Sequence, residues 1–228
     1  YVVRALLPGA SSCELVREGE SKGIPMRKIH SLGFFEEEIK SKNYFRYQFK
    51  VTYPEKITHL IDDPYRFLPT LSESDLFLIG KGDDHKIYQK LGSHLATIDG
   101  VKGVRFAVWA PSARRVSLVG NHNLWNGRAH PMRLLGFSGI WEIFIPGLAA
   151  GACYKYEILG PNDDTPFLKT DPCAISFEPP PHHAAVVCDL SGFSWSDSDW
   201  MEKRRSLTSQ QVPVSIYEVH LGSWRRVP

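Results

Sequence analysis

The chain has 228 residues, of which 43% are hydrophobic and 23% charged, a composition typical of an ordinary globular protein. Its 27 basic and 25 acidic residues leave a net charge of +2, too small to indicate a nucleic acid or an anionic membrane surface as partner. No apolar run is long enough to span a bilayer. The composition therefore excludes a membrane-spanning or strongly nucleic-acid-binding protein.

The first residues do not have the pattern of a signal peptide, and the four cysteines are scattered without the paired spacing of a metal site (Cys13, Cys153, Cys173 and Cys188). Free thiols in a reducing cytoplasm are the simplest interpretation, so we expect a cytoplasmic protein. We expect no metal and no cofactor.

Two stretches of the chain repeat one another in the same order. Pro8 recurs as Pro111, 103 positions later, and Gly33 recurs as Gly139, 106 positions later. The Asp-Pro pair at 63–64 recurs at 171–172, an offset of 108, and both pairs are typical of turns. Because the period is about one small domain, it predicts two tandem copies rather than a solenoid.

Each copy has the pattern of an antiparallel β-sandwich. In the second copy, short apolar or alternating runs at 106–109, 116–119, 141–145 and 152–158 are separated by turn signals. Alternation in the last run places Tyr154, Tyr156 and Ile158 on one face. We expect Trp109 and Trp141 in the core. The predicted fold is all-β, with two immunoglobulin-like sandwiches.

The predicted organisation has four parts. Residues 1–78 form a first sandwich that lacks its lead-in strand, and residues 79–190 form the second. The stretch 71–80 predicts a short helix, with Ser72 as its N-cap and Gly80 just after its end. Residues 191–212 form a linker with a short helix. Residues 213–228 would begin a further domain.

The last stretch, residues 214–224, predicts one buried β-strand. A strand needs a partner, so we expect a larger domain to follow and residues 216–221 to be unpaired on at least one edge. Glu218 and His220 share a face of this strand, and we interpret both as structural residues.

The second copy, in residues 105–111, 139–142 and 154–156, resembles the family-48 carbohydrate-binding modules of α-amylase-superfamily enzymes. Residues 60–67, 123–133 and 217–224 narrow the resemblance to bacterial 1,4-α-glucan (glycogen) branching enzymes. The resemblance implies a chain cut before a (β/α)8 catalytic barrel, which would be its covalently continuous partner. Such enzymes cleave an α-1,4 link and transfer the glucan to a 6-hydroxyl.

Retaining glycosyl transfer needs two neighbouring carboxyl groups, which barrel enzymes carry at the ends of later strands. The resemblance therefore implies no catalytic residue in this chain. We expect the chain to be inactive alone, and to position or support α-glucans such as glycogen and maltooligosaccharides.

The candidate carbohydrate-binding residues lie in one loop and one strand. Trp125 stands between Asn123 and Asn126 and offers an aromatic ring for sugar stacking. The resemblance implies that Lys155 contacts glucan. His122 replaces an aromatic residue that the family usually has here. In the structural alternative, Trp125 packs on Pro131 and Met132 to brace the loop.

Two other functions remain open. A stand-alone glucan-binding or regulatory module would have no use for the strand at 214–224. A related debranching or trehalose-releasing enzyme is disfavoured by residues 128–133 and by the two-module layout.

Overall fold

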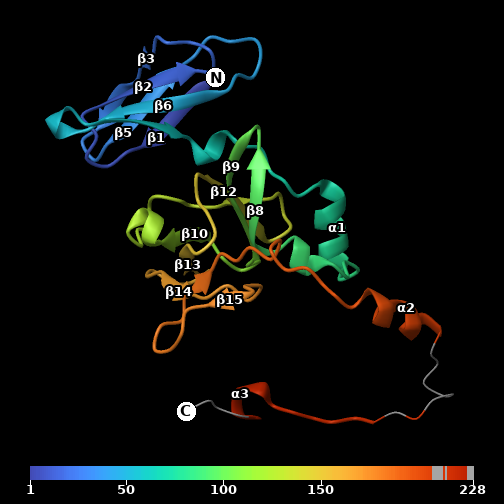
Figure 1. Cartoon of the computed structure of the whole chain (residues 1–228). Coiled ribbons are helices and arrows are strands. Elements are labelled where there is room, and N and C mark those ends of the chain that lie inside the picture. The colour runs from blue at the N-terminus through green and yellow to red at the C-terminus, as the bar shows by residue number, and fades with distance from the viewer. Residues whose placement is uncertain (207–212, 214, 225–228) are drawn as a thin grey trace. The chain divides into compact units, whose positions relative to one another are not determined.

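The structure, a computed structural model, describes residues 1–206, 213 and 215–224 (Figure 1). The first copy contains two antiparallel sheets. One has the order β1-β5-β4, formed by Val2–Leu6, Phe34–Glu38 and Arg27–His30. The other has the order β3-β2-β6-β7, formed by Ile24–Pro25, Ser12–Arg17, Tyr47–Thr52 and Thr58–Asp62.

Alternating side chains of these strands form the first core. In β1 the buried Val3 and Ala5 alternate with exposed neighbours, and in β6 the buried Phe49 and Val51 alternate in the same way. They belong to one cluster with Leu15 of β2. Two sheets that share one apolar layer make this copy a β-sandwich.

The second copy repeats this arrangement with more strands. One sheet has the order β11-β12-β9-β8, formed by Arg133–Leu134, Ile140–Pro146, Val101–Trp109 and Gly92–Ile98. The other has the order β10-β13-β16-β15, formed by Arg115–Gly120, Cys153–Leu159, Ala185–Val186 and Ser176–Phe177. Strand β14, Phe167–Lys169, pairs with β13 outside this path. The predicted strands are confirmed, and Tyr154 and Tyr156 are fully buried.

Matching hydrogen bonds confirm the internal duplication. The Leu7 amide donates to the Gly33 carbonyl at 2.8 Å, and the Ala110 amide donates to the Gly139 carbonyl at 2.8 Å. Gly33 has a φ of +89° and Gly139 a φ of +74°. Both glycines also lie against the opposing loop, since a Cβ on Gly139 would lie 2.7 Å from the Cα of Pro111. The two glycines thus hold the same hairpin contact in each copy.

The two aspartates of the Asp-Pro pairs also have equivalent partners. Asp63 accepts from the Tyr47 phenol at 2.6 Å and from the Tyr65 amide at 2.9 Å. Asp171 accepts from the Tyr156 phenol at 3.0 Å and from the Cys173 amide at 2.8 Å. Both carboxylates therefore close a turn and fix it to a core tyrosine, as the turn interpretation predicted.

The segment between the copies packs on the second sandwich. The ring of Phe67 lies edge-on against Phe144 of β12, with centroids 4.7 Å apart. The buried Glu142 carboxylate accepts from the Thr70 amide at 3.1 Å. In the described residues, four 3-10 turns, η1 to η4, are formed by Pro54–Lys56, Pro64–Arg66, Ile87–Gln89 and Asn121–Asn123.

Helix α1, Glu73–Lys81, begins as predicted. Ser72 caps it, because its hydroxyl accepts from the Asp75 amide. The predicted end before Gly80 is wrong, since the helix continues to Lys81 and its C-cap is Gly82, whose φ is +76°. Gly82 closes the helix by donating its amide to Ile79.

The structure also corrects the prediction that Trp109 lies in the core. Its side chain is 59% exposed rather than in the core, whereas Trp141 is buried as predicted. The reason is strand alternation. Phe106 and Val108 of β9 point into the sandwich, so Trp109 points to the opposite face.

Residues 190–228 group separately from residues 1–189. They contain α2, Ser198–Ser206, which fits the predicted linker helix, and α3, Leu221–Trp224. The predicted strand at 214–224 is wrong in the described residues, because 215–220 carry no strand pairing and 221–224 form a helical turn. A strand exists only where a neighbour accepts its backbone hydrogen bonds. Val214 lies outside the described residues.

Candidate functional site

The loop that follows β10 is braced by Asn123. The Asn123 Oδ1 accepts from the Gly120 amide at 3.0 Å, and its Nδ2 donates to the Leu118 carbonyl at 2.9 Å. The same Nδ2 lies 2.9 Å from Nδ1 of His130. Because these contacts use both ends of the amide, Asn123 shapes the loop, and its side chain has little hydrogen-bonding capacity left for a ligand.

Trp125 is held in a fixed orientation. Its backbone has a φ of +58°, and its amide donates to the Gly120 carbonyl at 3.0 Å. The indole Nε1 donates to Oδ1 of Asn121 at 2.9 Å. The side chain is 37% exposed. With its N–H engaged, the indole can offer a ligand its ring face rather than a hydrogen bond.

Asn126 is exposed at the tip of this loop. Its Oδ1 accepts from the Arg128 amide at 3.0 Å, which closes the turn that follows Trp125. This carbonyl side of the amide is therefore engaged, while the side-chain NH₂ makes no other hydrogen bond to the described residues. Asn126 can still donate to a ligand beside the indole.

Lys155 lies on the outer face of the second sandwich. Its neighbours in β13, Tyr154 and Tyr156, are buried in the core, so alternation turns Lys155 and Glu157 outward. The Lys155 Nζ is 3.0 Å from Nε2 of His183. The pair gives this face a cationic donor beside an imidazole.

The loop carrying Trp125 covers the same face of the sheet as Lys155. Gly127 lies against Glu157, because a Cβ at that glycine would collide with the Glu157 carboxylate. Ser117 pairs with Glu157 across the ladder and is fully buried, although it does not point into the core. The structure thus brings the Trp125 loop and Lys155 together on the outer face of β10 and β13.

His183 and Asn121 were not predicted as site residues. No spacing in the sequence signals that His183 meets Lys155, since the two residues come together only through the pairing of β13 and β16. The exposure of Trp109, in contrast, could have been found from alternation along β9.

Two histidines lie at one end of the second sandwich. The rings of His122 and His130 stack with centroids 5.3 Å apart. Burial lowers the pKa of His130 to about 4, and burial also lowers the pKa of His122. Both rings are therefore neutral at physiological pH, which gives each ring one donor and one acceptor.

In the described part of the chain, no cluster of three or more histidine, cysteine, aspartate or glutamate side chains has the grouping that a metal ion needs. No helix among the same residues has the length and hydropathy needed to cross a membrane.

Two family models match the chain. Residues 90–174 match carbohydrate-binding module 48 (isoamylase N-terminal domain), and residues 1–65 match the N-terminal domain of alpha-1,4-glucan branching enzyme GlgB. The second sandwich thus matches the model of the family-48 carbohydrate-binding modules. The first sandwich matches the model of the GlgB N-terminal domain.

Whole-chain similarity agrees with these models. The chain is 46% identical over 227 residues to the 1,4-alpha-glucan branching enzyme GlgB of Rubrobacter xylanophilus, covering 100% of this chain and 31% of that protein. It is 46% identical over 225 residues to GlgB of Thermosynechococcus vestitus, covering 98% of this chain and 29% of that protein. The chain corresponds to the N-terminal region of GlgB-type branching enzymes and spans about 30% of their length.

Among solved structures, the chain is similar to a type I pullulanase from Bacillus subtilis complexed with maltose. The TM-score is 0.40 and the sequence identity 16%, and the match covers 86% of this chain and 26% of that one. Similarity at this level does not bear on function.

Proposed function

We propose that this chain is the non-catalytic N-terminal region of a 1,4-α-glucan branching enzyme, and that its second sandwich holds α-glucan on the face formed by Trp125 and Lys155. The observation that carries the proposal is that the loop of Trp125 covers the face from which Lys155 projects, within a module of family 48. Both sandwiches would be of the immunoglobulin-like type, followed in the parent enzyme by a catalytic barrel.

The chemistry of the face suits a glucan. A glucose ring has an apolar face that stacks on an indole, and its equatorial hydroxyls accept hydrogen bonds from an ammonium group. Trp125 offers a ring of fixed orientation, so that little side-chain freedom is lost on binding. Lys155 and His183 offer the polar contacts. Asn126 would contribute a donor at the edge of the loop.

The role in the parent enzyme follows from tethering. A glucan held on this module is presented to a covalently linked barrel at an effective concentration on the order of millimolar. Cleavage of the α-1,4 link and transfer to a 6-hydroxyl would be carried out by carboxylates of that barrel. The module would thus favour long chains, which reach both sites, over short ones.

Trp109 is a second candidate platform. Its ring is 59% exposed, more than that of Trp125, and it lies on β9 of the other sheet. An exposed tryptophan has a large apolar surface that water does not solvate well, so a sugar ring could stack there as well. Separate substitution of Trp125 and of Trp109 distinguishes the two candidate stacking surfaces.

The test is calorimetric titration of the 228-residue chain with maltoheptaose. We expect saturable binding that Trp125→Ala weakens about tenfold, the loss of one aromatic stacking contact. Trp200→Ala, which removes an exposed indole from α2, is the matched control and should leave affinity unchanged. A loss seen only with Trp109→Ala would move the site to β9. Absence of binding by the wild type at millimolar sugar would refute the proposal.

A further inference from the structure

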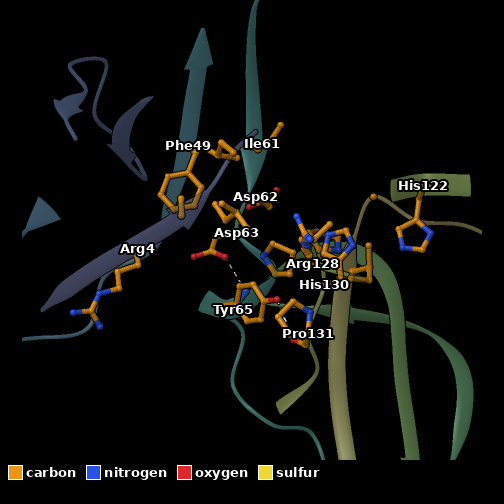
Figure 2. A pocket seen from close by; sticks show the side chains of 18 of the residues that line it. Arg4, Phe49, Ile61, Asp62, Asp63, Tyr65, His122, Arg128, His130 and Pro131 are labelled. Atoms are coloured by element: carbon orange, nitrogen blue, oxygen red, sulfur yellow. Dashed lines mark hydrogen bonds between the residues drawn. The ribbon is translucent and has the colours of Figure 1, made fainter. Parts of the chain in front are cut away.

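A cleft of about 770 Å³ lies between the two sandwiches. Figure 2 shows Phe49, Ile61 and Asp63 of the first copy on one side and His122, Arg128 and His130 of the second on the other. Its volume falls within the range of about 300–1,000 Å³ that is usual for ligand sites. The cleft is distinct from the Trp125 face, because first-copy strands form one of its walls.

The walls are mostly apolar. Leu6 of β1 and Ile61 of β7 line the cleft from the first copy, and Ile145 and Leu148 line it from the second. The 40% exposure of Leu6 fits its position, since it points away from the first core. Such walls suit the apolar faces of a ligand.

The polar groups of the cleft have unused hydrogen-bonding capacity. Both ring nitrogens of His122 are buried, and neither has a hydrogen-bond partner among the described residues. A buried polar atom without a hydrogen-bond partner is unfavourable, and a ligand hydroxyl would supply that partner. The Arg128 guanidinium makes no ion pair or hydrogen bond to the described residues either. These two side chains can donate to and accept from an incoming molecule.

The charges of the cleft do not favour an anion. Arg4 points away from it in Figure 2 and pairs with Glu36 at 2.7 Å. The carboxylates of Asp62 and Asp63 lie at the cleft, where Asp62 is paired with Arg66 at 2.7 Å. Neutral histidines, one arginine and nearby carboxylates fit a neutral, hydroxyl-rich ligand with apolar faces better than a phosphate.

We propose that this cleft is a second α-glucan site, which takes a short maltooligosaccharide segment and requires both sandwiches. This proposal rests on the proposed function for its ligand class, but not on the Trp125 face. His122 and Arg128 would bind sugar hydroxyls, and Leu6, Ile61 and Leu148 would contact ring faces. The first sandwich would then contribute to glucan binding directly.

The test follows the ring signals of His122 and His130 by NMR while the 228-residue chain is titrated with maltoheptaose. Leu6→Trp fills the cleft from β1. Val2→Trp is the matched control, because Val2 is 53% exposed on the same face of β1 and does not line the cleft. Equal thermal stability of the two variants shows that Leu6→Trp leaves the fold intact.

We expect saturable shifts of the His122 signals in the wild type and in Val2→Trp, a loss of those shifts in Leu6→Trp, and their persistence in Trp125→Ala. No shift at millimolar maltoheptaose would overturn the proposal, while retained binding at Trp125 would leave the proposed function standing. Shifts that disappear with Trp125→Ala but persist in Leu6→Trp would also overturn it. So would a response to inorganic phosphate alone.

Discussion

The phenol of Tyr65 donates a 3.0 Å hydrogen bond to the backbone carbonyl of Pro131, 66 positions later in the chain. This bond joins the end of the first sandwich to the loop of the second. Nearby, Arg133 donates to the Phe67 carbonyl at 3.0 Å. The loop that carries Trp125 is therefore also fixed to the segment at the end of the first sandwich. These hydrogen bonds connect the two candidate glucan sites.

Tyr65→Phe removes this bond without changing the shape of the ring. We expect a loss of about 0.5–1 kcal/mol in the free energy of unfolding, the usual net contribution of one partly exposed hydrogen bond. Urea denaturation measures the loss. Tyr88→Phe is the control, since Tyr88 is 61% exposed. If the two variants lose the same free energy, the Tyr65 bond contributes nothing.

Gly139→Ala tests the contact that repeats in both copies. Alanine there must adopt a φ of +74° and approach the Pro111 Cα to 2.7 Å. Gly147→Ala imposes nearly the same φ, +75°, with no atom within 4 Å. We expect about 1 kcal/mol of destabilisation for Gly147→Ala and at least about 2 kcal/mol more for Gly139→Ala. Thermal and urea unfolding compare them, and equal losses would contradict the close approach.

Substitution of Asn123 should lower stability more than substitution of Asn126, although the sequence predicts both residues as sugar ligands. Asn123→Ala leaves the Gly120 amide and the Leu118 carbonyl without partners, so we expect a stability loss of about 1–3 kcal/mol. Asn126→Ala, at an exposed turn, should cost under about 1 kcal/mol. Unfolding curves give both values. A larger loss for Asn126→Ala would contradict the brace assigned to Asn123.

His130 should make stability depend on pH. Burial lowers the pKa of His130 in the folded chain to about 4, against 6.5 for an ordinary histidine. Between these values the unfolded state binds more protons, so the free energy of unfolding falls as the pH decreases from 6.5 toward 4. The slope from one such group is at most about 1.4 kcal/mol per pH unit.

His130→Asn isolates this contribution, because asparagine cannot take up the proton. We expect the variant to lose less stability than the wild type between pH 6.5 and 4.5, as measured by urea unfolding at several pH values. Parallel curves for the two proteins would show that His130 is not held neutral.

The sequence predicts the parts of the fold that local pattern determines. The spacing of Gly33 and Gly139, and of Asp63 and Asp171, predicts the duplication. The two glycines both have a positive φ, and the two aspartates both accept a hydrogen bond from a tyrosine. Alternation in β13 predicts the burial of Tyr154 and Tyr156. Alternation in β9 also predicts the exposure of Trp109, although its position on a strand led us to expect it in the core.

The remaining features depend on residues distant in the sequence. Gly80 and Gly82 can both end a helix, and the choice between them is not visible in the local sequence. The meeting of Lys155 with His183 depends on the pairing of two strands. The cleft needs both sandwiches, so no motif within either copy predicts it.

The proposed function requires that α-glucan bind on the outer face of β10 and β13. The most direct measurement is the amide and indole NMR spectrum of the 228-residue chain titrated with maltoheptaose. We expect saturable shifts for the Trp125 indole and for Lys155 and His183, with no shift for the Trp200 indole. Unchanged Trp125 and Lys155 signals at millimolar sugar would contradict it.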